Sequence, residues 1–315
     1  MRRREFLEIA AATAVGVVCV GPAAAEPKQW PALTGEIGIT TGSFVRHLSE
    51  TPQAGKLRLL DLPRIMREEM DMRVLDLMTA TLVSMEPAYL EQLRTAAEKV
   101  GCVLTNLKMN LRDLDLGSED EGMRRHAIDE FKGTIDAAAL LGVRWVRPLP
   151  GNKRPVMATL AKSYRELIDH AAPRNISLLV ENFGWLSSDP EAVPELIKAI
   201  GSGVAAQPDT GNWANNEVRY AGLARAFPLA ASCDFKFMEF NPTTGAERVN
   251  NHLCSGLAVE TQESGLSNAE LSGDKVSQVG VALDEGGFAG FERGFVGAVF
   301  DFDANGTKVA DVGER

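Results

Sequence analysis

The sequence predicts an α/β fold, a (β/α)8 TIM barrel whose eighth unit is irregular or incomplete. Between residues 35 and 241, short apolar runs alternate with longer amphipathic or alanine-rich helical patterns. This alternation predicts a parallel sheet with helical crossovers. Seven or eight such units favour a closed barrel over an open, doubly wound sheet. No Gly-x-Gly-x-x-Gly motif follows the first strand, so a dinucleotide-binding fold lacks its main support.

The predicted elements are read from the period of their apolar residues. The strands are residues 36–44, 72–79, 102–110, 143–150, 176–185, 203–212 and 232–241. The helices between them are residues 62–70, 87–100, 119–141, 157–172, 190–200 and 217–228. Two helix starts carry capping signals, Ser118 and the pair Asp189-Pro190, because Asp can cap a helix and Pro fits its first turn.

The last part of the chain, residues 242–315, is rich in Gly, Ser and Asn. It contains two weak strand candidates, residues 279–283 and 295–302, and a poor helix over 263–277. No strong helix closes the chain. Two interpretations stay open: the segment is an irregular eighth unit, or it is appended to the barrel.

The first 25 residues have the three-part form of an export signal. A basic head is followed by an apolar stretch over 9–20 and by the small residues Ala23, Ala24 and Ala25. Arg3-Arg4, followed by Glu-Phe-Leu, fits the twin-arginine type. The apolar stretch is short for a membrane span. We expect cleavage after Ala25, a periplasmic or secreted protein, and no stable membrane association afterwards; the alternative is an N-terminal helix that stays.

The composition of the chain limits the classes of ligand that it is expected to bind. The net charge is −10, whereas a nucleic-acid partner would require a basic face. A small neutral ligand such as a sugar is compatible with this charge. The cysteines follow no metal-ligand spacing, and Cys102 and Cys233 in strand-like runs are expected to be buried thiols.

Polar residues cluster at the carboxyl ends of the predicted strands, where a barrel of this kind builds its active site. They are Thr40, Thr41, Ser43, Asp76, Asn106, Lys108, Asn110, Arg147, Glu181, Asn182, Asp209, Asn212, Asp234, Lys236 and Glu239. Three acids, Glu181, Asp209 and Asp234, end or follow consecutive strands and should converge on one mouth. Carboxylates from several strands suit Mg²⁺ or Mn²⁺, or Zn²⁺ if a nitrogen ligand joins them.

Asp209, in the stretch AAQPDTGNW, poses the problem most sharply. A carboxylate at the end of a buried strand is costly unless something neutralises it. A metal ion is one answer. The alternative needs no metal: Asp209 caps the next turn and Glu181 pairs with Lys236 or Arg147. An alternative role for Lys236 is only to neutralise the charge of Asp234.

In addition to Lys236, five side chains are candidates for binding a substrate. Arg147 is a salt-bridge partner or holds a substrate carboxylate or hydroxyl. Trp185 and Trp213 either stack on a sugar ring or pack into the protein. Asn212 follows Asp209 closely, and His47 lies just past the first strand.

Two of these segments carry a family resemblance. The segments LLVENFGW (178–185) and AAQPDTGNW (205–213) resemble the fifth- and sixth-strand motifs of the xylose isomerase-like barrels. This is the sugar phosphate isomerase/epimerase group that also includes endonuclease IV. CDFKFMEFN and VRWVRPLPG are similar to the seventh- and fourth-strand segments. The resemblance spans roughly residues 35–241.

The resemblance implies a divalent ion held by Glu, Asp, His and Glu from successive strands. Glu181 matches the first ligand and Asp209 the second, whereas Asp234 stands where the His is expected. The last Glu has no clear match, and Glu292, Asp301 and Asp303 are weak candidates. An Asp in place of the His favours Mg²⁺ or Mn²⁺ over Zn²⁺.

Three functions follow as hypotheses. The first is an exported, metal-dependent isomerase, epimerase or related lyase that acts on a keto-sugar or glycoside, with Glu181 moving the proton. The second is a non-catalytic sugar-binding barrel with a decayed metal site. The third, phosphodiester hydrolysis of the endonuclease IV kind, requires several His ligands and a basic face, whereas this acidic chain has four His in all. The oligomeric state is left open.

Overall fold

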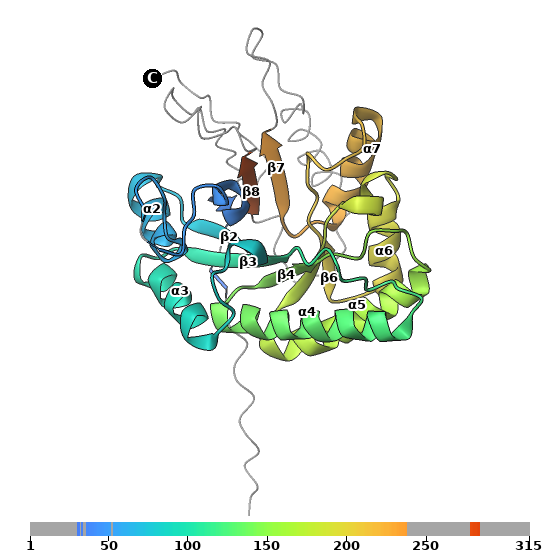
Figure 1. Cartoon of the computed structure of the whole chain (residues 1–315). Helices are drawn as coiled ribbons and strands as arrows, with labels where there is room; N and C mark the ends of the chain where they lie inside the picture. Colours follow the sequence, from blue (N-terminus) through green and yellow to red (C-terminus); the bar gives the residue numbers. More distant parts are fainter. Residues whose placement is uncertain (1–29, 32, 34–35, 52, 238–277, 284–315) are drawn as a thin grey trace, which may run out of the picture.

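The computed structural model describes residues 30–31, 33, 36–51, 53–237 and 278–283 (Figure 1). Its strands are β1 (Glu36–Thr40), β2 (Val74–Met78), β3 (Val103–Met109), β4 (Trp145–Pro148), β5 (Ser177–Val180), β6 (Val204–Ala206), β7 (Cys233–Phe237) and β8 (Gln278–Leu283). All pair in parallel, in the order β6-β5-β4-β3-β2-β1-β8-β7.

Two isolated parallel bridges close this sheet into a barrel. Ala206 pairs with Ala230, and Asp209 pairs with Asp234, which joins the β6 side of the sheet to the β7 side. The predicted (β/α)8 class is therefore confirmed. The weak strand candidate at 279–283 is β8, which lies between β1 and β7. The candidates at 263–277 and 295–302, the acids Glu292, Asp301 and Asp303, and the signal over 1–25 lie outside the described residues.

The helices lie outside the strands (Figure 1). They are α2 (Leu62–Glu69), α3 (Pro87–Lys99), α4 (Glu121–Leu141), α5 (Met157–Ala171), α6 (Ala192–Ile200) and α7 (Asn216–Ala226). Short 3-10 turns are η1 (Thr41–Phe44), η2 (Leu59–Asp61), η3 (Thr79–Thr81), η4 (Ala172–Arg174), η5 (Gly184–Ser187) and η6 (Phe227–Leu229). No described helix is both long and apolar enough to cross a membrane.

Two expected helix starts are corrected. The N-cap of α4 is Asp120, whose Oδ1 accepts a hydrogen bond from the Met123 amide at 2.9 Å, and not Ser118. Asp189 uses its carboxylate on the Glu191 amide, and α6 begins only at Ala192. At α4 an Asp that satisfies a first-turn amide sets where the helix begins. At α6 the Asp189 carboxylate holds the turn ahead of the helix, and the N-cap is Glu191, which makes no side-chain capping bond.

The observed strands are shorter than the predicted ones, mostly at their carboxyl ends. After β1 the chain enters η1, where the Thr40 hydroxyl accepts from the Gly42 amide. After β5 it enters η5 within three residues of Glu181. The apolar periodicity therefore covers each strand together with the first residues of the loop that forms the mouth.

The barrel interior is layered along each strand. Trp145, Leu179 and Ala205 form a small apolar cluster of their own. Side chains two residues apart on a strand point to the same face. The next layer toward the carboxyl ends therefore contains the polar residues Arg147 on β4 and Glu181 after β5. The main apolar core lies between the sheet and the helices.

The two cysteines expected to be buried are confirmed as buried free thiols. Burial raises the pKa of Cys102 to about 12. Cys254 lies outside the described residues.

Several helix-to-strand turns require a left-handed backbone. Gly101, before β3, has φ +69, and Gly203, before β6, has φ +85. A Cβ at Gly203 would lie 2.6 Å from Cγ2 of Ile168 on α5, whereas a Cβ at Gly101 would meet nothing within 4 Å. The two turns share a backbone constraint but differ in how closely α5 approaches.

We predict that Gly203→Ala destabilises the fold by about 1–3 kcal/mol more than Gly101→Ala. Both variants bear the left-handed penalty of about 1–2 kcal/mol, so their difference isolates the contact with Ile168. Urea unfolding of both variants measures it. Equal losses would show that α5 relaxes freely around the added methyl group.

Candidate active site

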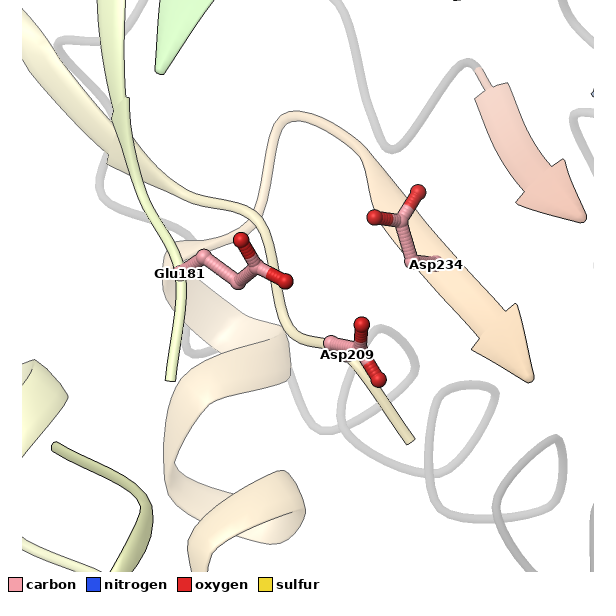
Figure 2. Close-up of side chains that lie close together, drawn as sticks. All are labelled: Glu181, Asp209 and Asp234. Carbon is pink, nitrogen blue, oxygen red and sulfur yellow. The ribbon is translucent and has the colours of Figure 1, made fainter. Parts of the chain in front are cut away.

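Three buried acids meet at the carboxyl-terminal mouth of the barrel. Glu181 follows β5, Asp209 follows β6, and Asp234 lies on β7. Each offers an oxygen within 4.8 Å of the other two. Figure 2 shows the three carboxylates turned toward one another. The structure thus brings together the three acids that the sequence analysis selected.

Asn182 fixes the backbone of Asp209. Its side-chain oxygen accepts from the Asp209 amide at 2.7 Å, and its side-chain NH₂ donates to the Asp209 carbonyl at 2.9 Å. This two-way bond ties the end of β5 to the end of β6, and both partners are fully buried. Its role was not expected from the sequence, although Asn182 was among the polar residues at strand ends.

The Thr-Gly-Asn residues after Asp209 build the turn that holds it. Oδ1 of Asp209 accepts from the amides of Gly211, at 2.7 Å, and Asn212, at 3.1 Å. The Thr210 hydroxyl accepts from the Lys236 amide at 3.0 Å, which ties this turn to β7. Asp209 therefore caps its own turn, as the metal-free alternative proposed.

Asn212 bridges an acid and a cation. Its side-chain NH₂ donates to Oε1 of Glu181 at 2.8 Å, and its side-chain oxygen accepts from Nζ of Lys236 at 2.5 Å. The predicted site residue Asn212 thus contacts two others. The arrangement holds Glu181 and Lys236 on the same side of the mouth.

Each of the three acids has a cation beside it. Nζ of Lys108 donates to both oxygens of Asp234, at 2.8 and 2.7 Å. Nε of Arg147 lies 2.8 Å from Oε2 of Glu181, and Nζ of Lys236 lies 2.8 Å from Oδ2 of Asp209.

These pairs settle the alternatives for the charged residues. Glu181 pairs with Arg147, as the metal-free alternative allowed. Lys236, however, has Asp209 as its close ion-pair partner, at 2.8 Å, whereas Asp234 is bonded to Lys108. Lys108 reaches across to Asp234 from β3.

A fourth acid, Asp76 on β2, completes the network. Its carboxylate lies 3.6 Å from Nζ of Lys108 and accepts a short hydrogen bond from the Thr105 hydroxyl. The β2–β3 register shifts between Leu75 and Leu77, a bulge that places two β3 residues opposite Asp76. Four acids thus surround three cations.

Lys108 was not selected as a site residue from the sequence. The available signal was a lysine inside a predicted strand, in the run LTNLKM, because a buried lysine requires a partner charge.

The buried acids of the mouth differ in the direction in which their pKa values are shifted. Burial raises the pKa of Asp209 to about 7; Lys236 opposes the shift, and the charges of Glu181 and Asp234 add to it. Burial also acts to raise the pKa of Glu181, but Arg147 and Lys236 outweigh it and leave that pKa below its usual value. Near neutral pH, Glu181 is therefore ionised, whereas Asp209 can hold a proton. Burial also raises the pKa of Asp234, with Lys108 opposing the shift and the charges of Glu181 and Asp76 adding to it.

The cations stay charged. Burial acts to lower the pKa of Lys108, but Asp234 and Asp76 outweigh it and raise the pKa above its usual value. Lys236 behaves in the same way beside Asp209 and Glu181. Both ammonium groups therefore act as fixed positive charges at neutral pH.

The residues do not fit a divalent ion as a complete site. Asp234 has both oxygens bonded to Lys108. The remaining oxygens, Oε2 of Glu181 and Oδ2 of Asp209, each have a cation nitrogen 2.8 Å away. An ion bound at about 2.0–2.2 Å would lie within about 5 Å of these nitrogens. At an effective dielectric of 20, the repulsion would be roughly 6–7 kcal/mol for each.

Several buried polar atoms in the carboxyl-terminal half of the barrel and in the loops that follow the strands have no hydrogen-bond partner among the described residues. They are Oε2 of Glu181, Oδ2 of Asp209, Nε and Nη1 of Arg147, Nε2 of Gln207, Oδ1 of Asn106, and Nε1 of both Trp185 and Trp213. Oε2 of Glu181 and Oδ2 of Asp209 each have an ion-pair cation 2.8 Å away, Arg147 and Lys236 respectively. Both acceptors and donors are therefore available to a polar ligand.

The remaining predicted residues take different places. Trp213 is buried, and its ring lies where a Cβ on Gly222 of α7 would be, which favours packing over sugar stacking. Trp185 is half-buried, and the guanidinium of Arg154 lies 5.6 Å from its ring centroid. His47 follows η1, where its backbone pairs with that of Leu57. Binding of a ligand by His47 stays a prediction.

We predict that Lys108→Met destabilises the protein by about 3–5 kcal/mol, because it leaves buried carboxylates without their cation. Urea unfolding measures the loss. Adding Asp234→Asn to the same chain should recover part of it, since one uncompensated charge is removed. Lys162→Met, at an exposed position on α5, is the control. If both lysine variants unfold alike, Lys108 carries no such role.

Comparisons with known proteins agree with the fold. The sequence matches the xylose isomerase-like TIM barrel family over residues 68–257. A comparison with curated protein sequences finds no match.

Three solved structures illustrate the likeness. The IOLI protein with a bound zinc atom is 17% identical, with a TM-score of 0.56 over 79% of this chain and 88% of that chain. A D-psicose 3-epimerase with D-tagatose, from Clostridium cellulolyticum H10, is 12% identical, with a TM-score of 0.59 over 78% and 84%. A xylose isomerase-like protein from Mycobacterium smegmatis, in complex with magnesium, is 17% identical, with a TM-score of 0.53 over 80% and 91%.

At such identities the structures establish the fold alone, and the family match carries the relationship. It covers more than half of the chain, including the strands that bear Lys108, Arg147, Glu181, Asp209 and Asp234. The protein belongs to the xylose isomerase-like TIM barrel family.

Proposed function

We propose that the protein is a carbohydrate isomerase or epimerase that removes a proton from a carbon of a keto-sugar or glycoside and returns one to the same or the neighbouring carbon. The observation that carries the proposal is the set of buried donors and acceptors at the mouth that lack hydrogen-bond partners among the described residues. A polyhydroxylated ligand offers hydroxyl groups that both donate and accept. The D-psicose 3-epimerase structures among the similar folds support the same substrate class.

Recognition would use both kinds of atom. Substrate hydroxyls would donate to Oε2 of Glu181 and Oδ2 of Asp209, and a substrate oxygen would accept from Nη1 of Arg147. Hydrogen bonds to charged groups are the stronger kind, about 1.5–3 kcal/mol each. Asn212 holds Glu181 in place for these contacts.

Proton transfer would divide between two acids with different pKa values. Glu181, which is ionised, would take a proton from the carbon next to the carbonyl. The electron pair of that C–H bond forms a C=C bond, and the carbonyl π pair moves to oxygen, giving an enediolate. Asp209, which holds a proton up to about pH 7, can return one. Return to the opposite face of the same carbon gives the epimer. Return to the former carbonyl carbon gives the isomer, with the α-hydroxyl proton moving to the former carbonyl oxygen.

A metal at this site stays a prediction. Two similar structures hold zinc or magnesium, and a divalent ion on Glu181 and Asp209 would supply Lewis-acid polarisation of the carbonyl. The cations beside these acids weigh against that assignment, and no step of the proposed transfer requires the ion.

A second candidate function has its own observation. Because every acid of the mouth is ion-paired, the barrel is also suited to bind a sugar without turning it over. Binding and exchange are separable by experiment, so the same assay distinguishes the two.

We predict that the protein exchanges the α-proton of at least one keto-sugar with solvent deuterium, and that Glu181→Gln slows the exchange by about 100-fold or more. NMR of a keto-sugar panel in D₂O, with and without added Mn²⁺, measures it. Glu217→Gln, on the exposed surface of α7, makes the same chemical change away from the site and should have no effect.

Two results of this experiment would contradict or replace the enzymatic proposal. If no sugar of the panel exchanges in either condition, the enzymatic proposal fails. Sugar binding without exchange would then support the binding barrel.

We also propose that the protein is exported. Its amino-terminal 25 residues support this through the twin-arginine pattern described above. In a bacterial host, the exported protein should begin at Glu26, and Arg3→Lys with Arg4→Lys should retain it in the cytoplasm. Cell fractionation and amino-terminal sequencing measure both, and Arg2→Lys is the control. Export that is indifferent to the double substitution would contradict the twin-arginine assignment.

A further inference from the structure

We propose that the chain's own cations take the place of a divalent ion at this mouth, and that the Lys236 ammonium supplies the positive charge next to the substrate's carbonyl oxygen. The role of Lys236 rests on the proposed isomerase or epimerase function. The replacement of the ion rests on the geometry of the charged side chains and can be tested without activity.

The first step is that Asp234 is already fully occupied by Lys108. Both of its oxygens accept hydrogen bonds from Nζ of Lys108, at 2.8 and 2.7 Å. Lys108 and Asp234 are buried, with side chains 4% and 3% exposed, so water does not compete for either. A metal that used Asp234 would have to displace an ammonium that has Asp76 as its other close acid.

The second step is the position of the other two cations. Arg147 sits on Glu181 and Lys236 sits on Asp209, each at 2.8 Å. The three cations come from three different strands, β3, β4 and β7, and each faces an acid from another strand or strand end. A divalent ion bound between Glu181 and Asp209 would therefore meet positive charge on two sides.

The third step distinguishes Lys236 from the other two. Its side chain is 28% exposed, whereas those of Lys108 and Arg147 are 4% and 3% exposed. Asp209 and Asn212 both hold its ammonium at the mouth. Lys236 is thus placed to meet a substrate from the open side.

The chemistry follows from that placement. When Glu181 removes the proton from the carbon beside the carbonyl, the carbonyl oxygen becomes negative as the C–H electron pair forms the C=C bond. A fixed ammonium beside this oxygen stabilises the developing charge. No electron leaves the substrate, and the proton returns to carbon, so the step requires neither an oxidant nor a reductant.

Metal content tests the replacement directly. The full-length protein, Glu181→Gln and Asp209→Asn are dialysed against Mn²⁺, Mg²⁺ or Zn²⁺, passed through a desalting column and analysed for bound metal. We expect less than about a tenth of an equivalent in each. Near-stoichiometric metal in the parent that is lost in both variants would overturn the proposal.

Exchange of the keto-sugar α-proton in D₂O tests Lys236. We expect exchange to persist in excess EDTA, to fall by about 100-fold or more in Lys236→Met through kcat, and to recover partly in Lys236→Arg, which keeps the charge. Lys198→Met, exposed on α6, should match the parent. Circular dichroism confirms that each variant is folded.

The outcomes separate the two proposals. Exchange that stops in EDTA and returns with Mn²⁺ overturns the inference but keeps the proposed function. Equal exchange in parent and Lys236→Met removes the role of Lys236. If the parent exchanges no sugar at all, the proposed function fails and the role of Lys236 falls with it, while the metal content still decides whether the cations replace the ion.

Discussion

The compensation of buried charge is the constraint on which the rest of the site depends. Four carboxylates lie inside the mouth of the barrel, where an isolated charge would cost several kcal/mol. Lys108, Arg147 and Lys236 offset three of these charges. The remaining negative charge is consistent with the raised pKa of Asp209, at about 7. The electrostatic state of the mouth is therefore set by cations built into the strands and by the acids whose pKa burial raises, Asp209 and Asp234.

The regular geometry of the barrel makes this compensation possible. Because side chains repeat every two residues along a strand, Trp145 and Leu179 fill the apolar layer, and Arg147 and Glu181 follow in the layer above. Asn182 then joins the ends of β5 and β6. A network that reaches from β2 to β7 is thus held by elements whose own packing fixes them, which favours the preorganised charges that proton transfer requires.

Membership of a family does not by itself determine the chemistry of this mouth. The chain shares its barrel with structures that hold zinc or magnesium and with a sugar epimerase. It keeps the Glu and Asp of the resemblance, but Asp234 stands where a His is expected and is bonded to Lys108. An Asp and a Lys that face each other neutralise each other, whereas a neutral His would leave Lys108 with Asp76, at 3.6 Å, as its close acid. Asp234 and Lys108 are therefore best understood together, as one buried ion pair.

The sequence by itself determined the class of fold, the order of its units and the acids that meet at the mouth, because alternating periodicity and polar strand ends are local properties of the chain. It also posed the choice at Asp209 between a metal and a turn with ion pairs. Only the tertiary structure decided which cation faces which acid. Lys108 and Asp234 are 126 residues apart in the chain, and their contact depends on the closure of the barrel. The same closure brings Lys236 on β7 to Asp209 after β6, because the periodicity of a single strand does not specify contacts across a closed sheet.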